Sequence, residues 1–194
     1  MTPDAATLRL AVFPRSGVVA DVLLVLAGTA FVALAAQVSV ELPFTPVPIT
    51  GQTFAVLLVG ASLGALLAFA SLGLYLFVGA LGAPIYADGA HGWAVLTGPT
   101  GGYVAGFVLA AVVSGYLAQR RWDRRFSSAV AAMLTGNVVI YAAGLPWLAV
   151  DQTLGFEGTL EAGLYPFVVG DLLKLYLAGA LLPGAWRLVE RMRR

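Results

Sequence analysis

Long stretches without any ionisable side chain are the feature that most constrains how this 194-residue chain can fold. Residues 49–83, for example, contain no Asp, Glu, Lys or Arg. A helix that crosses a bilayer needs about 20 consecutive, mostly apolar residues. Hydrophobic residues make up 60% of the sequence and charged ones 11%, whereas soluble domains usually carry about 25% charged residues. The sequence therefore predicts one membrane-embedded, all-α domain over residues 1–194.

Charged and proline-rich segments divide the chain into six predicted membrane-spanning helices. The run 49–83 would form about 50 Å of continuous helix, which exceeds a hydrocarbon core of about 30 Å. We therefore place a turn at Ser62–Gly64 and expect a short helix on each side of it. The first helix should end where three prolines follow in 41–48. The four longer predicted helices cover 22–40, 100–119, 126–149 and 166–186.

The distribution of arginine supports six spans, because Lys and Arg collect in cytoplasmic loops. With six spans, all arginines lie on the side of both termini, which makes 1–20 a cytoplasmic segment and 187–194 a cytoplasmic basic tail. These arginines are Arg9, Arg15, Arg120, Arg121, Arg124, Arg125, Arg187, Arg191, Arg193 and Arg194. The loops on the opposite, external side carry Glu41, Asp88, His91, Asp151, Glu157 and Glu161.

An alternative interpretation of the first apolar run is a cleaved signal peptide. Arg9 and Arg15 would form its basic region, and Ala33–Ala35 would provide an A-x-A-like cleavage site. The run continues to Val40, beyond the usual apolar core of about 7–15 residues. An uncleaved helix also completes the arginine distribution, so we favour a multi-pass protein of the cell membrane.

Several functional classes are excluded by composition. The formal net charge of +1 lacks the basic excess typical of nucleic-acid-binding domains. The sequence has no cysteine and a single histidine, so it cannot build a thiolate or multi-histidine metal site. We expect no metal, no cofactor and no nucleic-acid partner, and contact with membrane lipids.

Asp171 and Lys174 are the charged residues that fall well inside a predicted span. Their spacing of three residues places both side chains on one helix face. Each charge alone would cost roughly 2.5–3.5 kcal/mol near the bilayer centre, so such residues normally face a bundle interior or a cavity. The carboxylate can accept from N–H groups of a ligand and the ammonium can donate to a carbonyl. The alternative is an ion pair that only fixes helix packing.

The segment 84–103 is rich in glycine and aromatic residues, and it should form an external lid. Backbone N–H groups at 98–102 could hold an anion at the start of the predicted helix 100–119, or the glycines could simply form a turn that starts this helix. The aromatic residues could contact a ligand or lie at the membrane interface, and polar residues within spans could bond between helices. The candidate binding residues are Gln52, Thr53, Tyr86, Asp88, Trp93, Thr100, Gly101, Gly102, Tyr103, Asn137, Tyr141, Asp171 and Lys174.

The segment 60–64 matches the G-x-S-x-G pattern of serine hydrolases. Ser62 should lie at a cytoplasmic turn, whereas His91, the only possible imidazole base, should lie in an external loop. A bilayer of about 30 Å would separate them, although a base must lie within about 3 Å of its nucleophile. We therefore expect no enzymatic activity and keep an intramembrane hydrolase, or a structural membrane assembly protein, as alternatives.

Four ordered motifs give the chain a family resemblance. They are 41–50 followed by 52–54, 96–103, 140–147 and 166–174. With these motifs the chain resembles the BioY family, the biotin-specific S components of energy-coupling factor (ECF) transporters. The resemblance implies a six-helix S-component fold that binds biotin beneath external loops, and it places Asp171 and Lys174 in the family's ligand-associated Gly-Asp-x-x-Lys element. It also implies a membrane-embedded T subunit and a pair of ATPases as partners.

Overall fold

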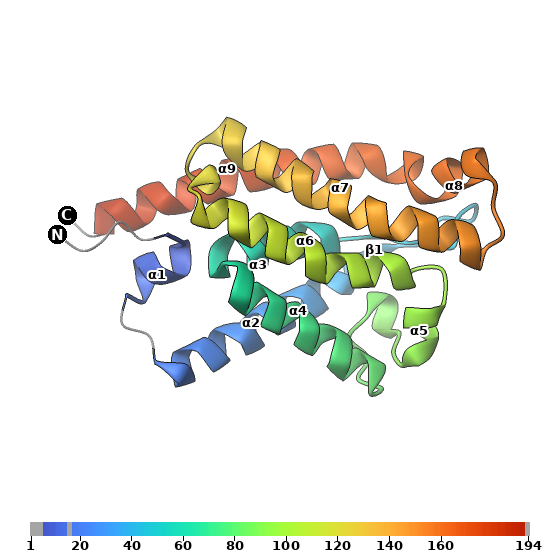
Figure 1. Ribbon diagram of the computed structural model, residues 1–194, viewed down its shortest axis with the longest axis horizontal. Coiled ribbons are helices and arrows are strands. Elements are labelled where there is room, and N and C mark those ends of the chain that lie inside the picture. The colour runs from blue at the N-terminus through green and yellow to red at the C-terminus, as the bar shows by residue number, and fades with distance from the viewer. Residues whose placement is uncertain (1–5, 15–16, 193–194) are drawn as a thin grey trace.

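The computed structural model of the chain describes residues 6–14 and 17–192, so Arg15, Arg193 and Arg194 lie outside the described residues. The structure is mostly helical (Figure 1). The longer helices are α2 (Val18–Ala36), α3 (Gln52–Leu63), α4 (Ala65–Ala80), α6 (Gly101–Gln119), α7 (Phe126–Asp151) and α9 (Val168–Met192). The short elements are α1 (Leu8–Val12), β1 (Ser39–Val40), β2 (Ile49–Thr50), η1 (Ala87–Gly89), α5 (Trp93–Thr97), η2 (Trp122–Arg124), α8 (Phe156–Gly163) and η3 (Tyr165–Phe167).

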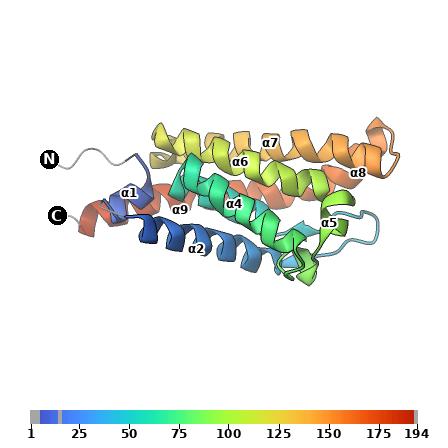
Figure 2. The same ribbon diagram turned by 60° about the horizontal axis from the view of Figure 1, so that its bottom comes forward.

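Helix α6 lies at the centre of the bundle and packs against α3, α4 and α7 (Figures 1 and 2). Its buried face consists largely of small residues, including Gly106, Ala110, Ala111 and Gly115. A Cβ atom at Gly115 would lie 2.6 Å from the amide nitrogen of Ala65, so only glycine lets the two helices approach this closely. Small residues at contacts are typical of helix packing within membranes.

The predicted division of the run 49–83 into two helices is confirmed. Helix α3 ends at Leu63, and Gly64 adopts a φ of 84°, a left-handed conformation that glycine adopts at little cost. In the part of the chain that the structure describes, four helical segments are long and apolar enough to cross a membrane, and α3 and α4 are shorter apolar helices. The four long segments are Val18–Ala36, Gly101–Gln119, Phe126–Asp151 and Phe156–Met192.

The predicted boundaries of the first two helices are wrong at the ends that adjoin the β1–β2 segment. Helix α2 ends at Ala36 because the chain then forms a short antiparallel ladder, in which Ser39 pairs with Thr50 and Val40 pairs with Ile49. Prolines in 41–48 cannot continue a helix, and the ladder satisfies backbone groups on both sides of them. Helix α3 therefore begins at Gln52 rather than at residue 49.

The last helix also departs from the prediction. Helix α9 begins at Val168, after the 3₁₀ turn η3, and continues to Met192 instead of ending before Arg187. Trp186 and Val189 extend it because they pack on Ala11 of α1. The predicted loops also contain short helices, namely η1 and α5 within 84–99 and α8 within 150–165.

The two ends of the bundle differ in charge. Helix α1, the C-terminal end of α9 and the α6–α7 connection lie at one end, and α5, α8 and the tip of the β1–β2 segment lie at the other (Figure 1). The first end carries Arg9, Arg120, Arg121, Arg124, Arg125, Arg187 and Arg191. The second carries Glu41, Asp88, Asp151, Glu157 and Glu161. This separation agrees with the distribution expected from the sequence.

Candidate ligand-binding site

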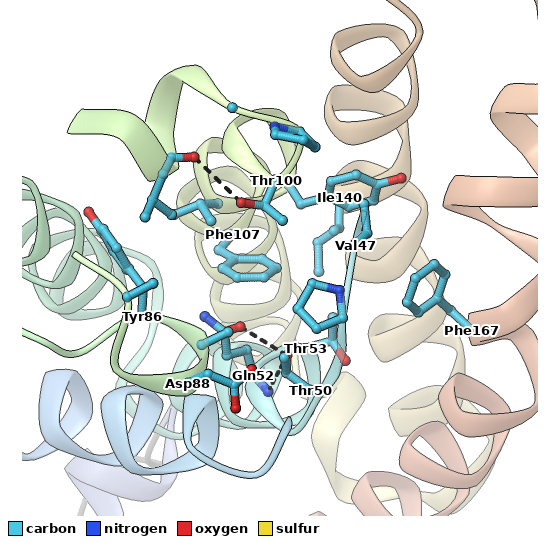
Figure 3. Close-up of a pocket in the computed structure, with 18 of the residues that line it drawn as sticks. Val47, Thr50, Gln52, Thr53, Tyr86, Asp88, Thr100, Phe107, Ile140 and Phe167 are labelled. Atoms are coloured by element: carbon cyan, nitrogen blue, oxygen red, sulfur yellow. Dashed lines mark hydrogen bonds between the residues drawn. The ribbon is translucent and has the colours of Figure 1, made fainter. Parts of the chain in front are cut away.

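A cavity of about 410 Å³ lies at the acidic end of the bundle, within the range of about 300–1,000 Å³ that small-molecule sites occupy. The β1–β2 segment, the η1–α5 segment and helices α3, α6, α7 and α9 all contribute to its wall (Figure 3). The predicted binding residues that line it are Gln52, Thr53, Tyr86, Asp88, Thr100, Tyr103, Tyr141, Asp171 and Lys174. The cavity therefore brings together residues from distant parts of the sequence.

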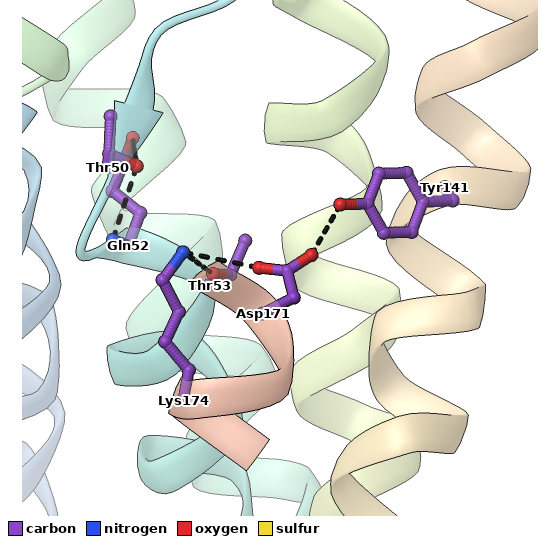
Figure 4. A network of polar contacts seen from close by, with 6 residues as sticks. All are labelled: Thr50, Gln52, Thr53, Tyr141, Asp171 and Lys174. Carbon is purple, nitrogen blue, oxygen red and sulfur yellow. Dashed lines mark hydrogen bonds and ion pairs between the residues drawn. The ribbon is translucent and has the colours of Figure 1, made fainter. Parts of the chain in front are cut away.

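Asp171 and Lys174 form the charged part of this wall (Figure 4). The Lys174 Nζ atom lies 3.2 Å from Asp171 Oδ1 and donates to Thr53 Oγ1 at 2.9 Å. The Tyr141 hydroxyl donates to the second oxygen, Oδ2, of Asp171. Only 5% of Asp171 is exposed, so this buried carboxylate would be costly without these partners. The contacts hold both charges at the edge of the cavity.

A second polar group connects β2, α3 and α4 beside the cavity. The Thr50 hydroxyl donates to Gln52 Oε1 at 2.9 Å, and Gln52 Nε2 donates to the Tyr75 hydroxyl at 2.7 Å. Tyr75 in turn donates to the carbonyl oxygen of Ile85 at 3.1 Å. These bonds fix the orientation of the Gln52 amide. Tyr75 could not be predicted as part of the site, since a tyrosine within an apolar run is also typical of helix packing.

Apolar side chains cover much of the remaining wall, including Val47, Phe107, Ile140 and Phe167 (Figure 3). These side chains could not be predicted as part of the site, because an apolar residue can equally face lipid, another helix or a cavity. Tyr86 adds an aromatic surface, with its hydroxyl donating to the carbonyl oxygen of Leu76 at 2.7 Å. Burial raises the pKa of Tyr86, so its hydroxyl remains a donor.

The η1–α5 segment covers the cavity, and hydrogen bonds attach it to the rest of the bundle. Ser39 Oγ donates to Asp88 Oδ2 at 2.8 Å, and Gln37 Nε2 donates to the carbonyl oxygen of Tyr86 at 3.1 Å. At the other end of the segment, Trp147 Nε1 donates to the carbonyl oxygen of Gly98 at 2.9 Å. Gly98 and Pro99 themselves line the cavity.

Four predicted binding residues lie outside this cavity. Trp93 is 68% exposed. Gly101 and Gly102 pack against neighbouring backbone, and a Cβ atom at Gly102 would lie 2.7 Å from the carbonyl oxygen of Ala143. Gly102 allows α6 and α7 to approach each other, whereas Gly101 packs against the carbonyl group of Leu96 in α5. Both contacts fit the alternative in which these glycines form the turn that starts the helix. Asn137 is buried, and among the described residues its Oδ1 has no hydrogen-bond partner.

The bond from Trp147 predicts an effect on ligand release. In Trp147→Phe the indole donor to Gly98 is lost, and a neutral hydrogen bond contributes about 1 kcal/mol. We expect ligand to dissociate about five-fold faster, since the covering segment opens more readily. Stopped-flow or filter-binding dissociation measurements would test this. Trp93→Phe is the matched control, and an equal acceleration in that variant would contradict the assignment.

The serine-hydrolase alternative is not supported by the geometry. Ser62 lies at the end of α3, whereas His91 follows η1 beyond the far end of α4. The 16 residues of α4 alone correspond to about 24 Å of helix, so Ser62 and His91 lie too far apart to act together.

Within 6–14 and 17–192, no group of three or more His, Cys, Asp or Glu side chains could hold a metal ion.

The sequence of the chain is similar to those of known proteins. Residues 5–191 match the BioY family. The chain is 35% identical over 167 residues to "Biotin transporter BioY" of Rhizobium etli, covering 82% of this chain and 89% of that protein. It is 36% identical to "Biotin transporter BioY" of Thermotoga maritima, covering 79% and 88%.

The fold is similar to that of a solved structure described as the S-component for biotin from an ECF-type ABC transporter. The TM-score is 0.76 at 23% sequence identity, and the match covers 87% of this chain and 92% of that one. At this identity the similarity concerns the fold. The family match over residues 5–191 and the relatives of 35% and 36% identity show that the chain belongs to the BioY family.

Proposed function

We propose that this chain is the biotin-binding membrane subunit of a biotin uptake system and that it transfers the vitamin without chemical change. The observation that carries this proposal is the Asp171–Lys174 pair in the wall of a cavity of about 410 Å³. Biotin combines a ureido group, which has two N–H donors and a carbonyl, with an apolar ring system. A carboxylate beside an ammonium group complements the ureido group, and the aromatic walls complement the rings.

In this proposal each part of the wall has its own role. Asp171 accepts from a ureido N–H, and Lys174 donates to the ureido carbonyl oxygen. Thr53 and Tyr141 hold these two charges in place through the bonds described above. The remaining predicted residues in the wall, Gln52, Tyr86, Asp88, Thr100 and Tyr103, shape the cavity and its cover.

The proposed topology has six spans, formed by α2, α3, α4, α6, α7 and α9. Helices α3 and α4 contain 12 and 16 residues, about 18 and 24 Å of helix. They would span the membrane where the bilayer is locally thinner. The end that carries the arginines would be cytoplasmic, together with both termini. The cavity would then open to the outside.

The energy for uptake would come from partner proteins, because the sequence contains no phosphate-binding loop of the G-x-x-x-x-G-K-S/T type. The partners proposed are an ECF transmembrane T subunit and ATPase subunits. No cofactor is proposed, and biotin is the transported substrate.

Calorimetric titration of the purified chain with biotin tests the proposal. We expect one biotin per chain and no comparable heat with thiamine or riboflavin. Mass spectrometry of the recovered ligand should show unmodified biotin. Equal binding of the three vitamins, or conversion of biotin into a product, would contradict the proposal.

The hydrogen bond from Tyr141 to Asp171 gives a further prediction. Tyr141→Phe removes a donor to a buried carboxylate, an interaction worth about 1.5–3 kcal/mol. We expect biotin affinity to fall at least ten-fold, because Asp171 loses the bond that orients it. Tyr116→Phe removes a hydroxyl that bonds to Arg120 at the basic end and should leave affinity unchanged. Equal affinities of the two variants would contradict the orienting role.

A further inference from the structure

The lining of the ligand cavity carries more negative than positive charge. Its carboxylates are those of Glu41, Asp88 and Asp171. Lys174 supplies the only cationic side chain among the described residues that line it. Because Asp171 and Lys174 lie 3.2 Å apart and neutralise each other, the charges of Glu41 and Asp88 remain. The lining is therefore net negative before a ligand enters.

These charges lie at different depths in the cavity. Asp171 is 5% exposed, whereas Glu41 and Asp88 are both exposed residues. Glu41 belongs to the segment between β1 and β2, and Asp88 belongs to η1 (Figure 3). Ser39, two residues before Glu41, donates to Asp88 Oδ2 at 2.8 Å and so holds these two segments together. Glu41 and Asp88 thus mark the mouth of the cavity, and Asp171 marks its buried end.

The acid tail of biotin has two environments available in this cavity, if the ureido group is held by the Asp171–Lys174 pair as in the proposed function, on which this inference rests. The inner wall contains buried apolar side chains such as Val104 and Phe107. An ionised carboxylate placed against them would be buried without a partner, at a high cost. At the mouth, the same carboxylate would meet two charges of its own sign.

Cationic side chains elsewhere in the bundle do not offset the charge at the mouth. Lys174 is the only lysine of the sequence, and its ammonium group contacts Asp171 and Thr53. The described arginines lie at the opposite end of the bundle (Figure 1). Helix α6 alone, with 19 residues, corresponds to about 28 Å between the two ends. His91 follows η1 but is not part of the lining.

The start of α6 also lies beside the cavity, and free N–H groups at a helix start can hold an anion. Here the N–H of Gly101 donates to the carbonyl oxygen of Gly98 at 3.0 Å. The Thr100 hydroxyl, which does line the cavity, donates to the carbonyl oxygen of Val95 at 3.4 Å. This turn is closed by its own hydrogen bonds, so it gives an incoming carboxylate little compensation.

We propose that the cavity also accepts biotin derivatives whose tail carboxyl is converted into an amide, and that Glu41 and Asp88 make it prefer a neutral or cationic tail to the free carboxylate. The ureido group and the rings are identical in these ligands, so their contacts with the inner wall do not differ. In water, a like charge about 8 Å away weakens binding about two-fold, and an opposite charge strengthens it by as much. With two carboxylates at the mouth, these factors multiply.

Calorimetric titration of the purified chain at pH 8 with three ligands tests the proposal. They are biotin, its neutral N-propyl amide and its cationic N-(2-aminoethyl) amide, which has nearly the same length as the N-propyl amide. At an ionic strength of about 0.02 M, the cationic amide should bind at least about ten-fold more tightly than biotin, with the neutral amide between them. At about 0.5 M this ratio should fall to about three-fold or less, since salt screens exposed charges.

The double variant Glu41→Gln/Asp88→Asn identifies the residues responsible. It removes both charges with little change of shape, and the amide oxygen introduced at position 88 can still accept the bond from Ser39. The ratio at low ionic strength should fall to about three-fold or less. Asp151→Asn/Glu157→Gln is the matched control, because it removes two charges from the same end but none from the lining, and it should keep the wild-type ratio.

The neutral amide should bind equally to all three proteins, which verifies that the variants are folded. At low ionic strength, biotin binding as tightly as the cationic amide, or more tightly, would overturn the proposal and leave the proposed function intact. An equal fall of the ratio in both double variants would overturn Glu41 and Asp88 as its cause, in favour of the overall charge of this end. Failure of all three ligands to bind the wild type would contradict the proposed function itself.

Discussion

Asp171→Asn is expected to lower biotin affinity by about 30- to 5,000-fold. The substitution removes the charge that accepts from Tyr141 and pairs with Lys174, and it leaves the ammonium group without its counter-ion in the cavity wall. Truncating one partner of a buried, hydrogen-bonded charge pair typically costs about 2–5 kcal/mol of binding. Calorimetric titration of the purified variant with biotin measures the change directly.

Two further variants separate a binding role from a packing role of this pair. Asp151→Asn makes the same charge change at the same end of the bundle, outside the cavity lining, and should bind as the wild type does. Asp171→Asn/Lys174→Met removes both charges, so no unpaired ion remains, and this variant should stay folded but fail to bind. A pair that only fixes helix packing would instead give a lower Tm with unchanged biotin affinity.

Gly102→Ala is expected to destabilise the bundle by about 1–3 kcal/mol, the usual cost of overpacking a close contact. The added Cβ atom would lie 2.7 Å from the carbonyl oxygen of Ala143 and would also meet the side chain of Trp147. Helices α6 and α7 would have to separate. Thermal unfolding in detergent should therefore show a clearly lower Tm.

Gly73→Ala is the matched control for this substitution. Gly73 lies within α4, and a Cβ atom there would meet no atom of the described chain within 4 Å. The change should leave Tm unchanged or raise it slightly. Alanine lowers the conformational entropy of the unfolded chain, which can stabilise the folded state by about 0.4–1 kcal/mol. Equal Tm values for the two variants would contradict the packing role assigned to Gly102.

The presence of the helices could be predicted from the sequence because apolar runs between charges are a local property, whereas the ends of α2, α3 and α9 depend on contacts with other segments. Most of the spanning helices could be predicted from the apolar runs between charged residues. The run 49–83 is too long for one span, which predicted the turn that the structure has at Gly64. The β1–β2 ladder could not be predicted in this way. Each strand has two residues, too few for a periodic pattern, and their pairing depends on how the proline-rich segment folds back.

The site was predictable only where a residue is unusual for its position. Asp171 and Lys174 were apparent because charges are costly within a span and their spacing places them on one face. Their contacts with Thr53 and Tyr141 depend on the packing of α9 against α3 and α7, which no local pattern encodes. The glycines at 101 and 102 were interpreted as ligand contacts, although close helix packing also requires glycine.

A structure of this chain determined with bound biotin tests the account most directly. We expect the ureido group in the cavity between α3, α6 and α9, with one N–H about 3 Å from an Asp171 oxygen and its carbonyl oxygen about 3 Å from Lys174 Nζ. Biotin held elsewhere, or held in this cavity with neither side chain within hydrogen-bond distance, would contradict the account.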